Sequence, residues 1–250
     1  MTRRVRRIFF LLSAVLLIAV FWNGYSKLPP VGALSGTYGD VVNAITVPER
    51  HITDAVTAVN FDIRGFDTLG EEFILFTSVM GAVLLMRRQS DEPGGDHEDR
   101  ARDRVVPNPS DAVRVTALLL VAPTVLIGIY IVAHGQVSPG GGFQGGVILS
   151  TAPLLLYLSG TFGQFRRAAP QRLIATSEAI GAAAYILIGG ACVALGGSFL
   201  QNLLPLGQSA SITGGGTVVF IDLGVGLEVS GGIVLILLVY LEELMEEKEG

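Results

Sequence analysis

Two glutamates, Glu178 and Glu228, interrupt stretches of sequence that are otherwise apolar enough to cross a membrane. An ionised carboxylate near the middle of a bilayer costs about 2.5–3.5 kcal/mol on insertion scales, so such a residue usually faces a protein partner or a cavity. The chain also holds Asp222 in its last apolar stretch and an acidic cluster from Asp67 to Glu72. This pattern indicates ion or proton handling inside a membrane rather than chemistry in water.

The acidic cluster has a spacing that suits a helix. Asp67 and Glu71 are four residues apart, and Arg64 precedes Asp67 by three. On a helix both acids lie on one face, with Arg64 one turn before Asp67. Arg64 could neutralise Asp67 and leave Glu71 free to titrate or to attract a cation. The alternative is a salt-bridged helix start, in which the acids complement the positive end of the helix dipole.

The last apolar stretch places Glu228 deep in the membrane. At 1.5 Å per residue from residue 217, Asp222 lies about 8 Å and Glu228 about 17 Å along the helix. Gly224 and Gly231 flank Glu228 at about one turn on either side. Small residues let another backbone approach, so we expect Glu228 to face a protein neighbour. It is either an ion-path residue or a hydrogen-bonded structural acid.

Two further residues are candidates for the same path. Glu178 lies near Gly181 and Ala182, so both interpretations of Glu228 apply to it as well. His134 ends the third apolar stretch. Histidine is the side chain most suited to proton exchange near physiological pH, so His134 could relay protons, or it could cap a turn.

The composition predicts the elements that position these residues. Half of the 250 residues are hydrophobic, only 16% are charged, and the mean hydropathy is +0.56. A soluble domain usually carries about a quarter charged residues. Long apolar runs predict an all-α polytopic membrane protein with about six transmembrane helices, two plus four. The predicted spans are 8–25, 66–87, 114–134, 143–161, 173–196 and 217–241.

Basic residues predict the orientation. With both termini cytoplasmic, all of the 17 Lys and Arg residues except Lys27, Arg50 and Arg64 fall on the inner side. This distribution follows the positive-inside rule and suits a multi-pass protein of the cell or inner membrane. The first span ends in aromatic residues rather than a small-residue cleavage site, which favours a retained anchor over a signal peptide.

The chain divides at a polar stretch. Residues 89–109 mix charge, glycine and proline without apolar periodicity, which is typical of a flexible linker. We therefore predict a two-span module over 1–88, a cytoplasmic linker over 89–109 and a four-span module over 110–250. In the segment 138–146, Gly142 and Gly146 predict a close contact between helices.

Other functions lack a signal in the sequence. No basic patch with interleaved aromatic residues predicts nucleic-acid binding. Cys192 is the only cysteine, so neither an intrachain disulfide nor a cysteine-based metal site is possible. Neither a nucleophile with its base nor a redox motif is visible. We predict a transporter subunit rather than an enzyme, with no cofactor and no metal centre.

Residues 110–245 resemble the B subunit of Mrp-type multisubunit sodium/proton antiporters, the MnhB family. The order of several motifs carries this resemblance. They are residues 133–135 (AHG), 138–146 (SPGGGFQGG), 177–181 (SEAIG), 199–202 (FLQN), 214–217 (GGGT) and 225–229 (VGLEV).

The N-terminal module looks like the two-span end of the antiporter's large A subunit, which is equivalent to the small E subunit of membrane-bound hydrogenases. Asp62 and residues 64–71 (RGFDTLGE) carry this likeness. The chain departs from the family pattern in fusing the two modules. Asp222 and Glu72 are also not expected family features, so their roles stay open.

The resemblance implies a membrane subunit of a sodium/proton antiporter that contributes acidic residues to an ion path or supports one. Its implied partners are the other small and large antiporter subunits, sodium ions, protons and the lipid bilayer. The alternatives are a subunit of a hydrogenase-like respiratory complex and a purely structural scaffold. The ion-path candidates are Asp67, Glu71, His134, Glu178 and Glu228, with Arg64 as a structural charge partner.

Overall fold

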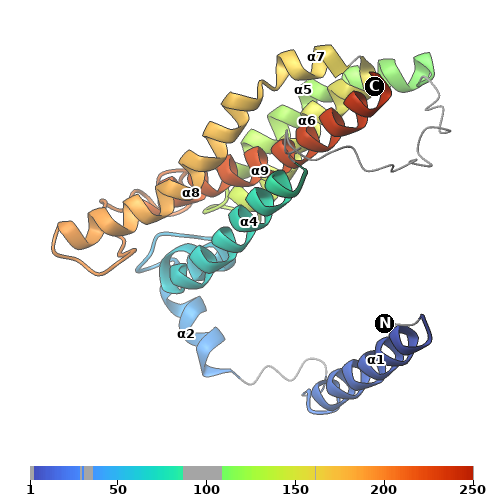
Figure 1. Cartoon of the computed structure of the whole chain (residues 1–250). Coiled ribbons are helices and arrows are strands. Elements are labelled where there is room, and N and C mark those ends of the chain that lie inside the picture. Colours follow the sequence, from blue (N-terminus) through green and yellow to red (C-terminus); the bar gives the residue numbers. More distant parts are fainter. Residues whose placement is uncertain (1–2, 29, 31–35, 87–108, 161, 250) are drawn as a thin grey trace. The chain divides into compact units, whose positions relative to one another are not determined.

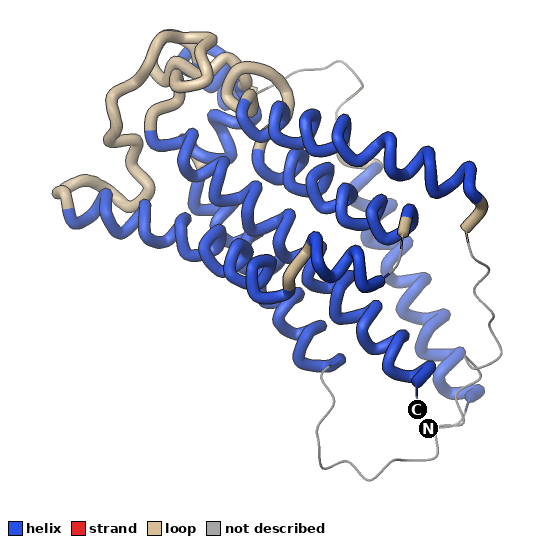
Figure 2. The backbone as a smooth tube through the Cα atoms, turned by 90° about the horizontal axis from the view of Figure 1, so that it is seen from above, coloured by secondary structure: helices blue, strands red, loops and turns tan. Residues whose placement is uncertain are grey.

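The computed structural model describes residues 3–28, 30, 36–86, 109–160 and 162–249. Throughout these residues the chain forms helices joined by loops, without a strand (Figure 2). Except for its last residue, the predicted linker 89–109 lies outside the described residues. The helices are α1 (Arg3–Tyr25), α2 (Thr37–Thr46), α3 (Ala55–Ala58), the π-helical turn η1 (Val59–Ile63), α4 (Gly65–Met86), α5 (Asp111–Ala133), α6 (Gly142–Ser159), α7 (Phe162–Ala168), α8 (Gln171–Ala194) and α9 (Thr217–Glu249).

Six of the described helices are long and apolar enough to cross a membrane, namely α1, α4, α5, α6, α8 and α9. The limits of these candidate spans agree with the predicted ones to within three residues. The predicted all-α, six-span fold is therefore confirmed. The cytoplasmic location of both termini stays a prediction.

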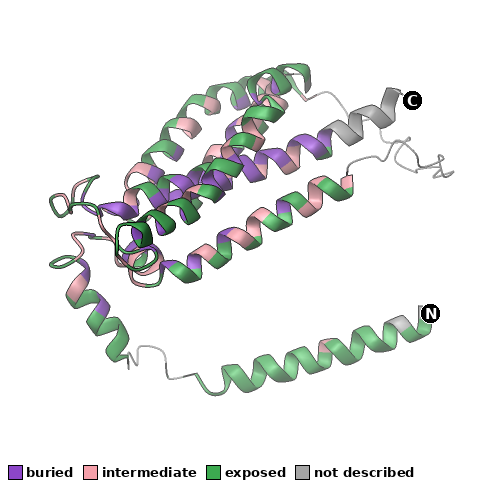
Figure 3. Ribbon diagram, turned by 60° about the vertical axis from the view of Figure 1, so that its left-hand side comes forward, coloured by how far each residue is buried: buried purple, intermediate pink, exposed green. Residues whose placement is uncertain are grey.

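Contacts divide the chain into two compact units, Met1–Asp40 and Val41–Gly250. The first unit holds α1, whose described side chains are almost all exposed (Figure 3). A helix that is apolar all round suits a lipid environment. The division into modules 1–88 and 110–250 stays a prediction, since α4 belongs to the same compact unit as the later helices.

Helix α9 is the central element of the second unit. It contacts α4, α5, α6 and α8 (Figure 1), and buried positions follow one another along it (Figure 3). Val218, Val225 and Val229 of α9 pack in one core with Tyr185 of α8 and with Ile52, which lies in the loop between α2 and α3. The helices packed against α9 therefore determine which of its polar side chains are buried.

Glycines bring α6 against α9. A Cβ atom on Gly142 would lie 2.9 Å from the Cβ of Val225, and one on Gly146 would lie 2.9 Å from the Cβ of Val229. Both distances are too short for a real side chain, so only glycine permits this helix separation. The predicted close contact through Gly142 and Gly146 is confirmed, and its partner is α9.

An apolar layer closes one end of the contact between α4, α8 and α9. Its buried members are Val79 of α4 and Leu235 and Val239 of α9, with Ile174 of α8 packed against them. We call the end where α4 ends and α5 begins the opposite end, and the end with the 47–64 and 195–216 segments the loop end. The apolar layer lies on the opposite-end side of Glu72 and Glu228.

Candidate ion-path site

Helix α4 presents Glu72, rather than Asp67 or Glu71, to the bundle. Its buried positions are Gly65, Thr68, Glu72 and Val79, whose spacing of three, four and seven residues defines one face of a helix. Glu72 is only 2% exposed, whereas Asp67 and Glu71 are exposed. The acid that faces the interior is therefore the one whose role the sequence left open.

Arg64 and Asp67 form an ion pair at the exposed start of α4. The predicted pairing is present, and it leaves Glu71 on the same outward side. The structure thus separates the acidic cluster into an outward pair of carboxylates and one inward carboxyl. A periodic set of small or polar residues at 65, 68 and 72 is the signal that could have identified Glu72.

Glu178 and Glu228 are both buried, at 1% exposure each. Close glycine contacts between α8 and α9 put them there. A Cβ atom on Gly181 would lie 2.8 Å from the Cα of Glu228, and one on Gly231 would lie 2.8 Å from the backbone nitrogen of Glu178. The expectation that Glu228 faces a protein neighbour is met within the chain itself, by α8.

The carboxyl groups of Glu72 and Glu228 are neighbours that interact electrostatically, and Glu178 acts on Glu228. Glu72 Oε2, Glu178 Oε1 and both carboxyl oxygens of Glu228 are buried without a hydrogen-bond partner. A buried carboxyl oxygen with no partner is costly, so each such group requires an explanation, of which a functional role is one. Helices α4, α8 and α9 therefore each contribute one buried acid with a carboxyl oxygen that lacks a hydrogen-bond partner.

Asp222 extends this set toward the loop end. It lies within electrostatic reach of Glu72 and of Asp54, the residue that caps α3. At 1.5 Å per residue, Glu72 lies about 10 Å and Glu228 about 17 Å from the loop-end start of their helices. Glu178 lies about 10 Å from the first residue of α8, which is at the opposite end. Acidic residues thus form a row from Asp54 to Glu178, which we call the acid row.

Asp222 also closes the start of α6. Its Oδ1 accepts a hydrogen bond of 2.5 Å from the backbone N–H of Gly142. The preceding Gly141 has φ of +113°, a conformation that favours glycine, and provides no side-chain cap. A carboxylate at this position complements the positive end of the helix dipole. Asp222 is therefore a cap supplied by α9 to a helix 80 residues earlier in the chain.

Two substitutions of Asp222 should separate the contribution of its hydrogen bond from that of its charge. In Asp222→Ala the N–H of Gly142 loses its partner, and we expect a loss of about 1–3 kcal/mol in the free energy of unfolding. Asp222→Asn keeps an acceptor oxygen and should lose less than half as much. Thermal unfolding of the purified variants measures both. Equal losses in the two variants would show that the hydrogen bond is not the stabilising feature.

His134 ends α5 and stacks on Tyr130. The two rings are 4.0 Å apart between centroids, and His134 Nδ1 lies 3.1 Å from the carbonyl oxygen of Tyr130. These contacts match the turn-capping alternative. A proton relay through His134 stays a prediction.

Side-chain hydrogen bonds to the backbone hold the segments of the loop end together. Asn202 Nδ2 donates to the carbonyl of Gly215, and Asn202 Oδ1 accepts from the N–H of Thr217, both at 2.8 Å. Thr57 Oγ1 donates to the carbonyl of Gly135 at 2.6 Å. The motifs 199–202 and 214–217 thus have a structural role. They fix the start of α9 and hence the position of its acids.

Asp62 is the acid beneath Arg50 at the loop end. Arg50 Nε lies 3.4 Å from Asp62 Oδ2, and the Asp62 side chain is only 4% exposed. Burial raises the pKa of Asp62, and the charge of Arg50 opposes this rise. Asp62 thus helps to anchor η1 at the entrance to α4.

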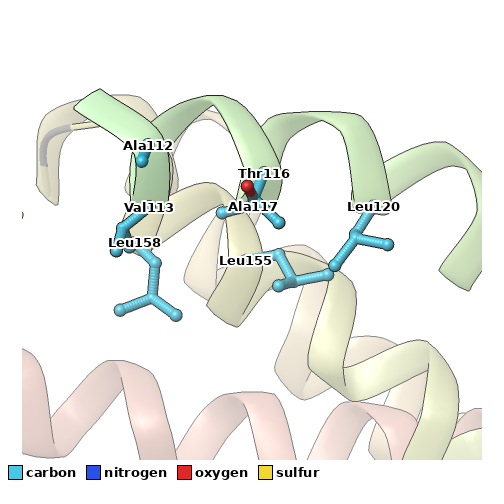
Figure 4. A pocket seen from close by; sticks show the side chains of 7 residues that line it. All are labelled: Ala112, Val113, Thr116, Ala117, Leu120, Leu155 and Leu158. Atoms are coloured by element: carbon cyan, nitrogen blue, oxygen red, sulfur yellow. The ribbon is translucent and has the colours of Figure 1, made fainter. Parts of the chain in front are cut away.

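A hollow between α5 and α6 is apolar and separate from the acid row. Its volume is about 360 Å³, and the side chains that line it come from both helices (Figure 4). Thr116 is the only polar side chain among those seven lining residues. This surface suits a lipid chain or an apolar helix better than an ion.

Comparison with known proteins identifies the C-terminal helices. Residues 112–235 match the family model described as a domain related to the MnhB subunit of Na+/H+ antiporters. A probable A/B subunit of a K+/H+ antiporter from Rhizobium meliloti is 31% identical over 123 residues, which are 43% of this chain and 12% of that protein. An uncharacterised protein of Methanocaldococcus jannaschii is 26% identical over 210 residues, 77% of this chain and 78% of its own length.

Two solved complexes contain similar chains. A chain of the membrane-bound sulfane sulfur reductase, an archaeal respiratory membrane complex, superposes with a TM-score of 0.71 and 26% identity, covering 95% of this chain and 98% of that one. A chain of the Mrp complex from Dietzia sp. DQ12-45-1b superposes with a TM-score of 0.70 and 24% identity, covering 96% of this chain and 26% of that one. Residues 112–235 are therefore an MnhB-related domain, in a chain whose fold is shared with chains of two multisubunit membrane complexes.

Proposed function

We propose that this chain is a membrane subunit of a multisubunit monovalent cation/proton antiporter and that its acidic residues contribute to the ion path. The observation that carries the proposal is the burial of Glu178 and Glu228, at 1% exposure each, inside a domain of the MnhB-related family. The relatives are named for different cations, Na+ in the family model and K+ in the Rhizobium protein. Sodium is our proposed cation because of the family resemblance.

The exposed acids of α4 support a role among other subunits. Asp67 and Glu71 lie in the first two turns of a membrane-spanning helix and face away from the bundle. A carboxylate facing lipid is unfavourable, so this face requires a polar neighbour. In the assembled complex we place another membrane subunit there, with Glu71 at the junction. His134 is a further proposed contributor, and the two-module arrangement with both termini cytoplasmic completes the proposal.

A respiratory complex is the second candidate. The similar chain in the sulfane sulfur reductase matches this one over nearly the full length of both. In such a complex the same acids would couple ion movement to electron transfer carried out by other subunits. Purification with the native partners decides between the two: large antiporter subunits alone support the first candidate, and subunits with redox centres support the second. In either case this chain is a transporter subunit rather than an enzyme.

Two isosteric substitutions test the proposed path. In the purified complex, reconstituted into vesicles, Glu228→Gln and Glu71→Gln should each abolish cation-driven proton movement while the complex still assembles. The amide has the shape of the acid but cannot release a proton or carry a charge. A fluorescent pH indicator inside the vesicles reports transport, and size-exclusion chromatography reports assembly.

Glu49→Gln is the matched control, since Glu49 is exposed in the loop after α2. It should keep normal transport. Normal transport in both path variants would contradict the proposed role of these acids. Loss of assembly in both would instead support the purely structural scaffold.

A further inference from the structure

Glu72 and Glu228 bring two buried carboxyl groups together from different helices. Glu72 is 2% exposed and Glu228 is 1% exposed. The two groups interact with each other, and three of their four oxygens have no hydrogen-bond partner in the described part of the chain. Both oxygens of Glu228 belong to this set, so its carboxyl group is buried where it meets Glu72.

No positive charge faces this pair from the helices that form it. The spans 65–86 of α4 and 217–241 of α9 contain neither lysine nor arginine. In α8 the only basic residue is Arg172, in the first turn and six residues before Glu178. Arg64 and Arg50 are paired with Asp67 and Asp62 at the loop end.

The other groups around the pair are neutral or acidic. Glu71 and Asp222 act electrostatically on Glu72, and Glu178 acts on Glu228. Tyr185 of α8 directs its hydroxyl to the carbonyl oxygen of Gly65 at 2.8 Å, so that proton is already engaged. Two adjacent carboxylates without a counter-charge cannot both be ionised, and the usual solution is one proton shared between them.

We propose that Glu72 and Glu228 form one proton-binding site inside the membrane, in which one carboxyl is protonated and donates a hydrogen bond to the carboxylate of the other. A bound proton removes the charge repulsion, because it neutralises one carboxyl and lets that carboxyl donate one hydrogen bond to an oxygen of the other. Within the described residues, no group of three or more His, Cys, Asp or Glu side chains could hold a metal ion. A proton needs only the two oxygens that the pair provides.

The surroundings indicate the side from which the site exchanges its proton. Asp54 and Asp222 continue the acid row to the loop end. Toward the opposite end, Val79, Leu235 and Val239 close the space between α4 and α9. Proton uptake therefore occurs from the loop end, and the proton leaves the site either back along the acid row or toward Glu178. Its use in antiport rests on the proposed function, whereas the binding of the proton does not.

Infrared difference spectroscopy of the purified complex tests the site without reference to transport. A protonated carboxyl group gives a C=O stretching band that is separate from that of a carboxylate. We expect this band in the unmodified complex at neutral pH. Glu72→Gln and Glu228→Gln should each shift this one band, because each variant leaves a single buried protonated carboxyl whose partner is now an amide. The double variant should remove the band. Glu71→Gln, one position away on the exposed side of α4, should leave the band in place.

The proposal is overturned if each single variant removes a different band, because the two acids are then protonated independently. It is also overturned if the band is unchanged in both. Should Glu72→Gln fail to assemble, Glu228→Gln alone decides, with Glu178→Gln as the comparison for a separate buried acid. A shifted band together with normal antiport would keep the proton site and contradict its use in transport.

Discussion

Gly181→Val should prevent α8 from packing against α9 and should abolish assembly of the folded protein. A Cβ atom at this position would lie 2.6 Å from the carbonyl oxygen of Gly224 and 2.8 Å from the Cα of Glu228. Both are backbone atoms of α9, so no side-chain rotation relieves the collision. Overpacking a core costs about 1–3 kcal/mol where side chains can adjust, and a backbone collision exceeds this. Size-exclusion chromatography and the yield of monodisperse protein measure the effect.

Gly190→Val is the matched control on the same helix. A Cβ atom on Gly190 has no atom within 4 Å, and Gly190 is exposed in the isolated chain. Both variants add the same β-branched side chain to α8, so they share any cost in helix propensity. If the two variants assemble equally well, the close contact between α8 and α9 does not control the fold.

Glu178→Met should stabilise the protein and abolish its transport. Glu178 is 1% exposed, and its Oε1 is buried without a hydrogen-bond partner, next to the Gly232 and Val79 positions. Methionine has a similar length and flexibility and places no polar atom in this space that needs a strong partner. Removal of the unsatisfied acid should therefore raise the free energy of unfolding by about 1–3 kcal/mol. Thermal unfolding measures the stability, and vesicle assays on the complex measure transport.

Thr176→Met provides the comparison on the exposed side of α8. It should change stability little and keep normal transport. A loss of stability in Glu178→Met would show that the acid holds the helices together, as in the structural alternative. A gain in stability with full transport would show that Glu178 is neither a structural contact nor part of the path.

Several features followed from the sequence because they depend on local composition. Each span is a run of about 20 apolar residues, which only a helix can carry across a bilayer. The predicted limits therefore agree with α1, α4, α5, α6, α8 and α9. Small neighbours also identified the inward sides of Glu228 and of the segment with Gly142 and Gly146, because close backbone contact requires the absence of a side chain.

The tertiary structure alone decided which acid of α4 faces the interior. Glu71 and Glu72 are adjacent in sequence, and one residue turns a helix by about 100°, so they lie on different faces. The acidic cluster does not indicate which of the two glutamates faces the interior, because Asp67 and Glu71 also share a face. Only the contact of α4 with α9 buries Glu72 and places it beside Glu228.

For Asp222 as well, the sequence determined one property and the tertiary structure determined another. The sequence by itself determined that this acid lies in a membrane span, because the surrounding residues are apolar. Only the packing of α9 against α6 brought its carboxylate to the N–H of Gly142. Hydropathy is a property of neighbours along the chain, whereas the partner of a buried acid is a property of neighbours in space, and here these neighbours are 80 residues apart.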